Sequence, residues 1–204
     1  MKIFLFTLFI LSFYLLSAQD ISVYNNYFSI PEIHNSAYIG ALPCTKISLS
    51  QKKQWLGIKG SPSQQILSAN ILHQTNKFRK SGFGGILFND LNGDFRTTNL
   101  RFIYAQHFMI KKSKGQWLSL ALALDMANKG VTKNFTNINN QNDPILNSIT
   151  QNKFLFDANF GLLYYSNKFS LGTAFYQLFS HKSIADFSYK TTFLGLIHAS
   201  YTLR

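Results

Sequence analysis

Apolar and polar residues alternate along eight segments of this 204-residue chain. In the clearest segment, residues 116–126, every second side chain from Leu118 to Met126 is large and apolar. A period of two is that of a β-strand, whose side chains point alternately to the two faces of a sheet. The pattern therefore predicts an all-β protein with strands at residues 46–55, 64–74, 81–89, 97–108, 116–126, 153–165, 169–175 and 193–203.

The length of these segments bears on what their apolar face contacts. Strands in soluble β-sandwiches have about five or six residues. Most segments here run to roughly nine to twelve, which is the length that a tilted strand needs to cross a bilayer. Aromatic residues gather near the segment ends, as in interfacial girdles: Trp55, Phe108, Trp117, Phe154, Tyr164 and Phe169. We expect an antiparallel transmembrane β-barrel of about eight strands, and a soluble secreted β-protein is the alternative.

The N-terminus has the anatomy of a secretory signal peptide. Lys2 precedes an apolar run over residues 3–16, and Ser17 and Ala18 offer small residues for cleavage. We expect three parts in the chain: a signal peptide at 1–18, a periplasmic N-terminal segment at 19–43 and an outer-membrane barrel at 44–204.

Composition narrows the classes of function. Hydrophobic residues make up 46% of the chain and charged residues 14%, which excludes intrinsic disorder. The net charge of +12 alone suggests nucleic acid, but basic nucleic-acid binders carry a far higher charged fraction, so we expect no such partner. The five histidines lack the spacing of metal ligands, and no nucleophile motif is present. We expect no enzyme, metal or cofactor, and we expect Cys44 to be a small buried or interfacial residue.

The connections between the predicted strands differ in length and charge. If the chain starts in the periplasm, the outward connections are 55–63, 90–96, 127–152 and 179–188, and the inward ones are 74–80, 109–115 and 166–168. Outer-membrane barrels keep their periplasmic turns short, which agrees with this assignment. The inward connections hold no acidic residue, and their cations form a predicted periplasmic basic rim: Lys77, Arg79, Lys80, Lys111, Lys112, Lys114 and Lys168. Such a rim attracts anionic lipid headgroups or an acidic partner. The long outward loop is a candidate contact for cargo.

Three charged residues fall on the polar face of consecutive predicted strands. Strict alternation places Arg101, Asp125 and Asp157 toward the lumen. Because an unpaired buried charge is costly, we expect them to pair there as a structural plug rather than as a ligand site.

Four ordered motifs resemble the PorP/SprF family of Bacteroidetes outer-membrane proteins. The chain carries H-N-S-A-Y-I-G, with Tyr38 and Gly40, where that family has N-P-A-Y-x-G. The other three motifs are a Q-W-x-G-x-x-G turn, a glycine-rich strand ending in N-D-x-x-G, and N-D-P in the long loop. Their residues are Gln54, Trp55, Gly57 and Gly60; Asn89, Asp90 and Gly93; and Asn142, Asp143 and Pro144.

The resemblance implies an integral outer-membrane protein that is accessory to type IX secretion, gliding motility or surface attachment of a cargo such as an adhesin. The implied partners are outer-membrane lipid, the secreted cargo and periplasmic components of the secretion machinery. The alternatives are a small outer-membrane pore or ligand channel, and a soluble secreted β-protein that binds acidic polymers.

The chain departs from the family pattern at two places. Ser36 stands where the family usually has proline. The sequence stops at Tyr201-Thr202-Leu203-Arg204, where family members usually continue through several more strands. A short barrel that closes with about eight strands and a truncated larger barrel are both compatible with this ending, and we favour the second.

Overall fold

A computed structural model of the chain describes residues 29–74, 76–131, 153–179 and 193–203. These residues form one antiparallel sheet of eight strands in the order of the sequence, which confirms the predicted all-β class. The strands are β1 (Lys46–Lys53), β2 (Ser63–Gln74), β3 (Arg79–Asn92), β4 (Phe95–Lys111), β5 (Gln116–Val131), β6 (Lys153–Tyr165), β7 (Phe169–Tyr176) and β8 (Leu194–Tyr201).

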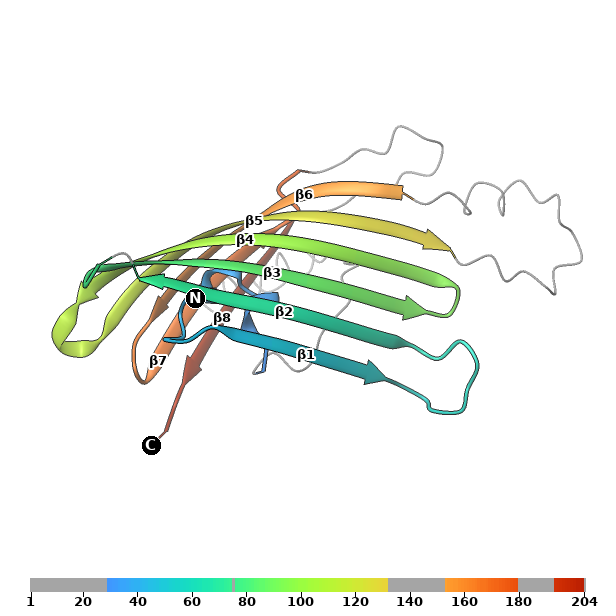
Figure 1. Ribbon diagram of the computed structural model, residues 1–204, viewed down its shortest axis with the longest axis horizontal. Helices are drawn as coiled ribbons and strands as arrows, with labels where there is room; N and C mark the ends of the chain where they lie inside the picture. The colour runs from blue at the N-terminus through green and yellow to red at the C-terminus, as the bar shows by residue number, and fades with distance from the viewer. Residues whose placement is uncertain (1–28, 75, 132–152, 180–192, 204) are drawn as a thin grey trace, which may run out of the picture.

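The sheet curls into half a barrel (Figure 1). β1 and β8 are its two edges, and each other strand pairs with its two neighbours in the chain. Three short 3-10 turns complete the described structure: η1 (Pro31–Ile33), η2 (Ser36–Tyr38) and η3 (Lys112–Lys114). Among the described residues, no helix has the length and apolar character needed to cross a membrane.

Several strands are longer than the sequence pattern predicted. The expected connection at 90–96 is wrong, because β3 and β4 continue until Asn92 pairs with Phe95. Gly93 makes this tight turn possible with a positive φ of 62°, a conformation that costs glycine little. β5 likewise extends to Val131, so the first residues of the expected 127–152 loop are strand.

Some of the predicted features lie outside the described residues. They are the signal peptide at 1–18, most of the two longest outward connections, and the motif residues Asn142, Asp143 and Pro144.

The convex face of the sheet is a continuous apolar surface. Cross-strand rows such as Phe83, Tyr104, Leu122, Phe160 and Phe175 run over five strands and point outward. Many of these side chains are largely exposed, Leu122 to 62%. An exposed apolar surface of this extent is too large for a monomeric protein in water and suits contact with lipid.

The concave face is lined by small and polar side chains. One inward row consists of Gly82, Ala105, Ala121, Gly161 and Ala174. Polar inward residues such as Ser119 and Asn159 are buried. The predicted assignment of the two faces therefore agrees with the structure, but the space on the concave side is filled.

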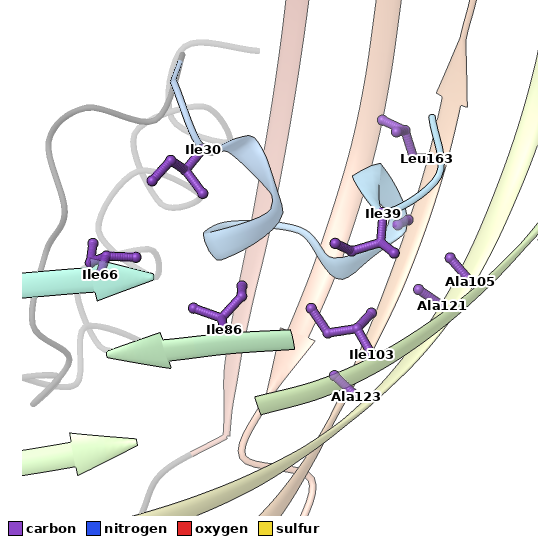
Figure 2. Packing of buried hydrophobic residues seen from close by; sticks show 10 residues of the cluster. Ile30, Ile39, Ile66, Ile86, Ile103, Ala105, Ala121, Ala123 and Leu163 are labelled. Atoms are coloured by element: carbon purple, nitrogen blue, oxygen red, sulfur yellow. The ribbon is translucent and has the colours of Figure 1, made fainter. Parts of the chain in front are cut away.

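Residues 30–41, called the inner segment below, fill that space. They belong to the N-terminal segment expected at 19–43, and the structure packs them against the concave face (Figure 1). Ile30, Ala37 and Ile39 of the segment are fully buried. They form one cluster with apolar side chains of the sheet, and Figure 2 shows Ile30 and Ile39 facing these sheet residues: Ile66, Ile86, Ile103, Ala105, Ala121, Ala123 and Leu163. Because the residues of this inward row are small, there is space on the concave side for the inner segment.

The outward apolar face generates the first prediction. Leu122→Arg places a charge in the middle of β5 on that face, and we expect it to cost about 2–4 kcal/mol of folding free energy in a bilayer. The measurement is urea unfolding in lipid vesicles, followed by heat-modifiable gel migration.

The control is Gln51→Arg, at an exposed position near the end of β1, where the same charge should cost about 0–1 kcal/mol. In a soluble protein both sites would be surface positions and both changes nearly neutral. Equal effects of the two substitutions would therefore contradict the lipid-facing assignment.

Candidate functional site

The inward-facing side chains of the sheet, called the wall below, hold the main chain of the inner segment. Five carbonyl oxygens of the segment accept hydrogen bonds from the wall. Arg101 and Tyr176 donate to the carbonyl of Ile33, and Tyr176 also donates to that of His34. Ser119 donates to the carbonyl of Ala37, and Lys80 donates to that of Ala41. The His107 ring forms a hydrogen bond with the carbonyl of Ile39. In return, Asn70 accepts from the amide of Gly40 at 2.8 Å. The wall thus satisfies backbone groups that sheet pairing does not satisfy.

Asn35 is the central side chain of the inner segment. It is fully buried, and its Nδ2 lies 3.0 Å from the carbonyl oxygen of Leu162 and 3.2 Å from that of Thr173. The same nitrogen is 3.0 Å from Nε2 of His198, while Oδ1 accepts from the amide of Ala37. One amide side chain therefore joins β6, β7 and β8 to the segment.

Two glycines of the wall allow the segment to approach closely. A Cβ atom at Gly82 would lie 2.6 Å from the carbonyl carbon of Ile39, and one at Gly161 would lie 3.0 Å from the amide nitrogen of Ala37. The first distance is shorter than real Cβ atoms show, and the second would require the neighbouring backbone to give by a few tenths of an ångström. The glycines therefore define where the inner segment sits.

The predicted charge cluster is partly assembled. Arg101 and Asp125 form a two-pronged ion pair, with Nε–Oδ1 at 2.6 Å and Nη2–Oδ2 at 2.8 Å. Asn159 donates to the same carboxylate at 2.7 Å, and Arg101 also reaches the inner segment at Ile33. Because every charged group here has hydrogen-bond partners, burial of the pair is tolerated.

Asp157 has a different set of contacts from the other two charges. It stands opposite Asp125 in the register of β5 and β6. Its carboxylate accepts from the amides of Ala158 and Phe179, at 2.7 and 3.0 Å. The side chain thereby fixes the chain that follows β7.

Six of the seven predicted rim cations are exposed at one end of the sheet. They lie in or beside the connections β2–β3, β4–β5 and β6–β7: Lys77, Arg79, Lys111, Lys112, Lys114 and Lys168. The described residues of these connections include no acidic side chain.

Lys80 is not part of the exposed rim. It follows Arg79 in β3, so strand alternation turns it inward, where only 9% of its surface is exposed. Its Nζ lies 4.8 Å from the centre of the Trp117 ring and 5.4 Å from that of Tyr165. Together with the bond to Ala41, these cation–π contacts make Lys80 a wall residue.

The motif turns lie at the opposite end of the sheet. In the β1–β2 turn, Gly57 and Gly60 have positive φ angles, as does Trp55, whose side chain is 68% exposed. The amide of Gly93 in the β3–β4 turn donates to the carbonyl of Gly60 at 3.2 Å, which joins the two turns.

The remaining motif residues occupy different places. The amide of Gln54 donates to the carbonyl of Pro62 and closes the β1–β2 turn. Asn89 accepts from Thr98 and Arg96 on the outer face, and Asp90 stands opposite Thr97 in β4. Tyr38 and Gly40 belong to the inner segment, where Tyr38 stacks on His198 with ring centres 5.5 Å apart.

Chemically, the arrangement binds a peptide main chain. Over the part of the chain that the structure describes, no three His, Cys, Asp or Glu side chains gather as metal ligands would. Cys44 is exposed, so it is not the buried residue that was one of the two expectations. It follows the inner segment and precedes β1.

Four residues of this site are not predicted from the sequence: Asn35, His107, Ser119 and Tyr176. The sequence does indicate that Ser119 and His107 point inward, because both are polar residues on the small-or-polar face of their strands. Alternation predicts only that this face lines the lumen, and it does not indicate a peptide segment for these residues to bind.

Comparison with known proteins gives one match. Residues 16–203 match a family described as type IX secretion system membrane protein PorP/SprF. None of the curated proteins and none of the solved structures matches the chain.

The ion pair generates the second prediction. Arg101→Met or Asp125→Leu alone leaves a buried charge without its partner, and each should cost about 3–5 kcal/mol of unfolding free energy. The double variant removes both charges and should cost clearly less than the sum of the two, with a coupling of about 1–3 kcal/mol. Urea unfolding of the four proteins in lipid vesicles measures the cycle, and strictly additive effects would contradict the coupling.

The close approach at β3 generates the third prediction. Gly82→Ala pushes a methyl group into the Ile39 carbonyl and should destabilise the fold by about 1–3 kcal/mol. Gly85→Ala is the matched control in the same strand, because its Cβ would meet nothing nearer than 3.7 Å. The same unfolding measurement compares the two. If Gly82→Ala were as well tolerated as the control, the inner segment would not sit where it is described.

Proposed function

The chain belongs to the PorP/SprF family of type IX secretion system membrane proteins, and we propose that it serves in the outer membrane as an accessory component of that system. Its role is to support secretion or surface attachment of a cargo such as an adhesin. The apolar convex face supports the membrane location, because it gives eight strands a surface suited to lipid.

The observation that carries the accessory role is the basic rim. Six exposed cations lie at one end of the sheet. Their field acts over roughly a Debye length, about 8 Å at physiological salt, and favours an acidic partner. We assign this end to the periplasm, because its described connections are short, whereas residues 132–152 separate β5 from β6 at the other end. The partner is an acidic periplasmic component of the secretion machinery.

The occupied concave face favours this role over that of an open pore. Wall side chains bind the inner segment through side chain–main chain hydrogen bonds, and its apolar residues are buried. The proposed function is therefore one of binding and attachment, with no catalytic step.

The fourth prediction tests the rim. Replacing Lys111, Lys112 and Lys114 with glutamine removes three exposed charges from one connection and should weaken co-purification of secretion-machinery proteins. The loss should be largest at low ionic strength, because salt screens the native attraction as well. The measurement is quantitative mass spectrometry of the proteins retained with the tagged chain over a series of salt concentrations.

The matched control removes three charges from the opposite end, with Lys52, Lys53 and Lys59 changed to glutamine. Heat-modifiable migration verifies that both triple variants fold. Binding of each protein to vesicles that contain anionic lipid separates a lipid-directed rim from a protein-directed one. Co-purification that is unchanged at every salt concentration, or equally weakened in the control, would refute the proposed role of the rim.

A further inference from the structure

Many of the buried side chains of the wall around the inner segment are polar, beside the apolar cluster described above. Its buried side chains include Ser68, Asn70, Lys80, His107, Ser119, Asp125, Asn159 and Ser170. An apolar core cannot be emptied without leaving a cavity that lacks contacts. A wall of hydroxyl, amide and charged groups can instead exchange its bonds for bonds to water. The polar part of the wall is therefore suited to an occupant that leaves, while the apolar contacts of Ile30, Ala37 and Ile39 oppose its departure.

The inner segment is held as a ligand rather than as a strand. Within the described residues, it takes no part in the pairing of the sheet. Its 3-10 turns are closed by its own bonds, such as Tyr38 to Asn35 and Ile39 to Ser36. The wall contacts it through side chains that bind main-chain carbonyls, and any peptide with the same backbone conformation can make those contacts.

Two side chains add selectivity to this main-chain binding. Asn35 joins three strands through its amide group, as described above. Tyr38 lies 3.3 Å from the Ser170 hydroxyl and stacks on His198. Between them, Ser36 and Ala37 are buried, and Ala37 lies against Gly161, so this part of the wall suits small side chains. The wall therefore selects asparagine, two small residues and tyrosine in succession.

Ser36 makes the resident segment an imperfect occupant. Its side chain is 2% exposed, and its hydroxyl has no hydrogen-bond partner among the described residues. A buried hydroxyl without a partner is destabilising by about 1–3 kcal/mol. A competing peptide without this hydroxyl makes the same contacts with the wall, and its binding does not include the free-energy penalty of burying an unpaired hydroxyl.

We infer that the wall is a binding site for a peptide turn, which residues 30–41 occupy in cis, and that a partner segment with asparagine, two small residues and tyrosine competes for it. This site is separate from the basic rim, so the inference goes beyond the proposed function and does not need the rim to act.

The experiment measures how often the inner segment leaves the wall. The full chain carries Cys44→Ser, so that a single introduced thiol is labelled. Ser36→Cys is nearly isosteric and breaks no hydrogen bond, because the native hydroxyl makes none with the described residues. We expect a water-soluble maleimide to label this thiol about 100-fold more slowly than one introduced by Lys112→Cys, because labelling requires local opening.

Three synthetic peptides of residues 29–43 then act as competitors. The native peptide should increase the labelling of the Ser36→Cys protein with a saturable dependence on concentration. The peptide with Ser36→Ala should reach the same labelling at about a tenfold lower concentration, because it lacks the unpaired hydroxyl. The peptide with Asn35→Ala should have no effect, and labelling of the Lys112→Cys protein should not respond to any of the three.

Two results would overturn the inference. If no peptide changes the labelling, the inner segment is a permanent part of the core. If the peptide with Asn35→Ala competes as well as the native one, the wall does not select this sequence. Neither result depends on co-purification with secretion proteins, so failure of this inference and failure of the proposed function are distinguishable.

Discussion

The structure depends on the hydrogen bonds between the wall and the carbonyl groups of the inner segment. In β2 to β7, strand pairing on both sides satisfies the backbone polar groups, as a lipid environment requires, whereas β1 and β8 each pair on one side only. Within the described residues, the inner segment forms no strand pairing with the sheet, so its carbonyl groups need other hydrogen-bond donors. Ser119, Lys80, Arg101 and Tyr176 supply them from four strands, and their polar side chains are possible on the concave face because the lipid-facing residues lie on the other. The apolar convex face and the polar concave face thus both result from the alternation of side chains along each strand.

Alternation also explains how much of the molecule the sequence predicts. The pattern from Leu118 to Met126 identifies β5 and its two faces, and the same rule places Arg101 and Asp125 on one face of neighbouring strands. The register of β4 and β5 then sets them opposite each other. The rule fails where a strand is polar on both faces. Asp90 and Asn92 resemble loop residues, so the continuation of β3 was missed. Lys80 directly precedes the predicted strand at 81–89 and therefore falls in the predicted turn, whereas β3 already begins at Arg79.

The inner segment could not be predicted by periodicity. Its residues show neither period two nor a helical period, and its 3-10 turns are set by contacts with strands that are far away in the sequence. Asn35 reaches Thr173 across 138 positions. The glycines at 82 and 161 indicate that another group approaches the strand closely. The absence of a Cβ atom does not indicate which group that is.

The positions of the two tryptophans have a spectroscopic consequence. Trp55 lies exposed in the β1–β2 turn, and Trp117 lies at the other end of the sheet with the Lys80 ammonium group over its ring. The chain has two tryptophans in all, so its intrinsic fluorescence has two sources with different surroundings. A soluble quencher reaches Trp55 directly, whereas emission from Trp117 reports whether Lys80 still lies over the ring. Light emitted by the unlabelled protein therefore distinguishes events at its two ends.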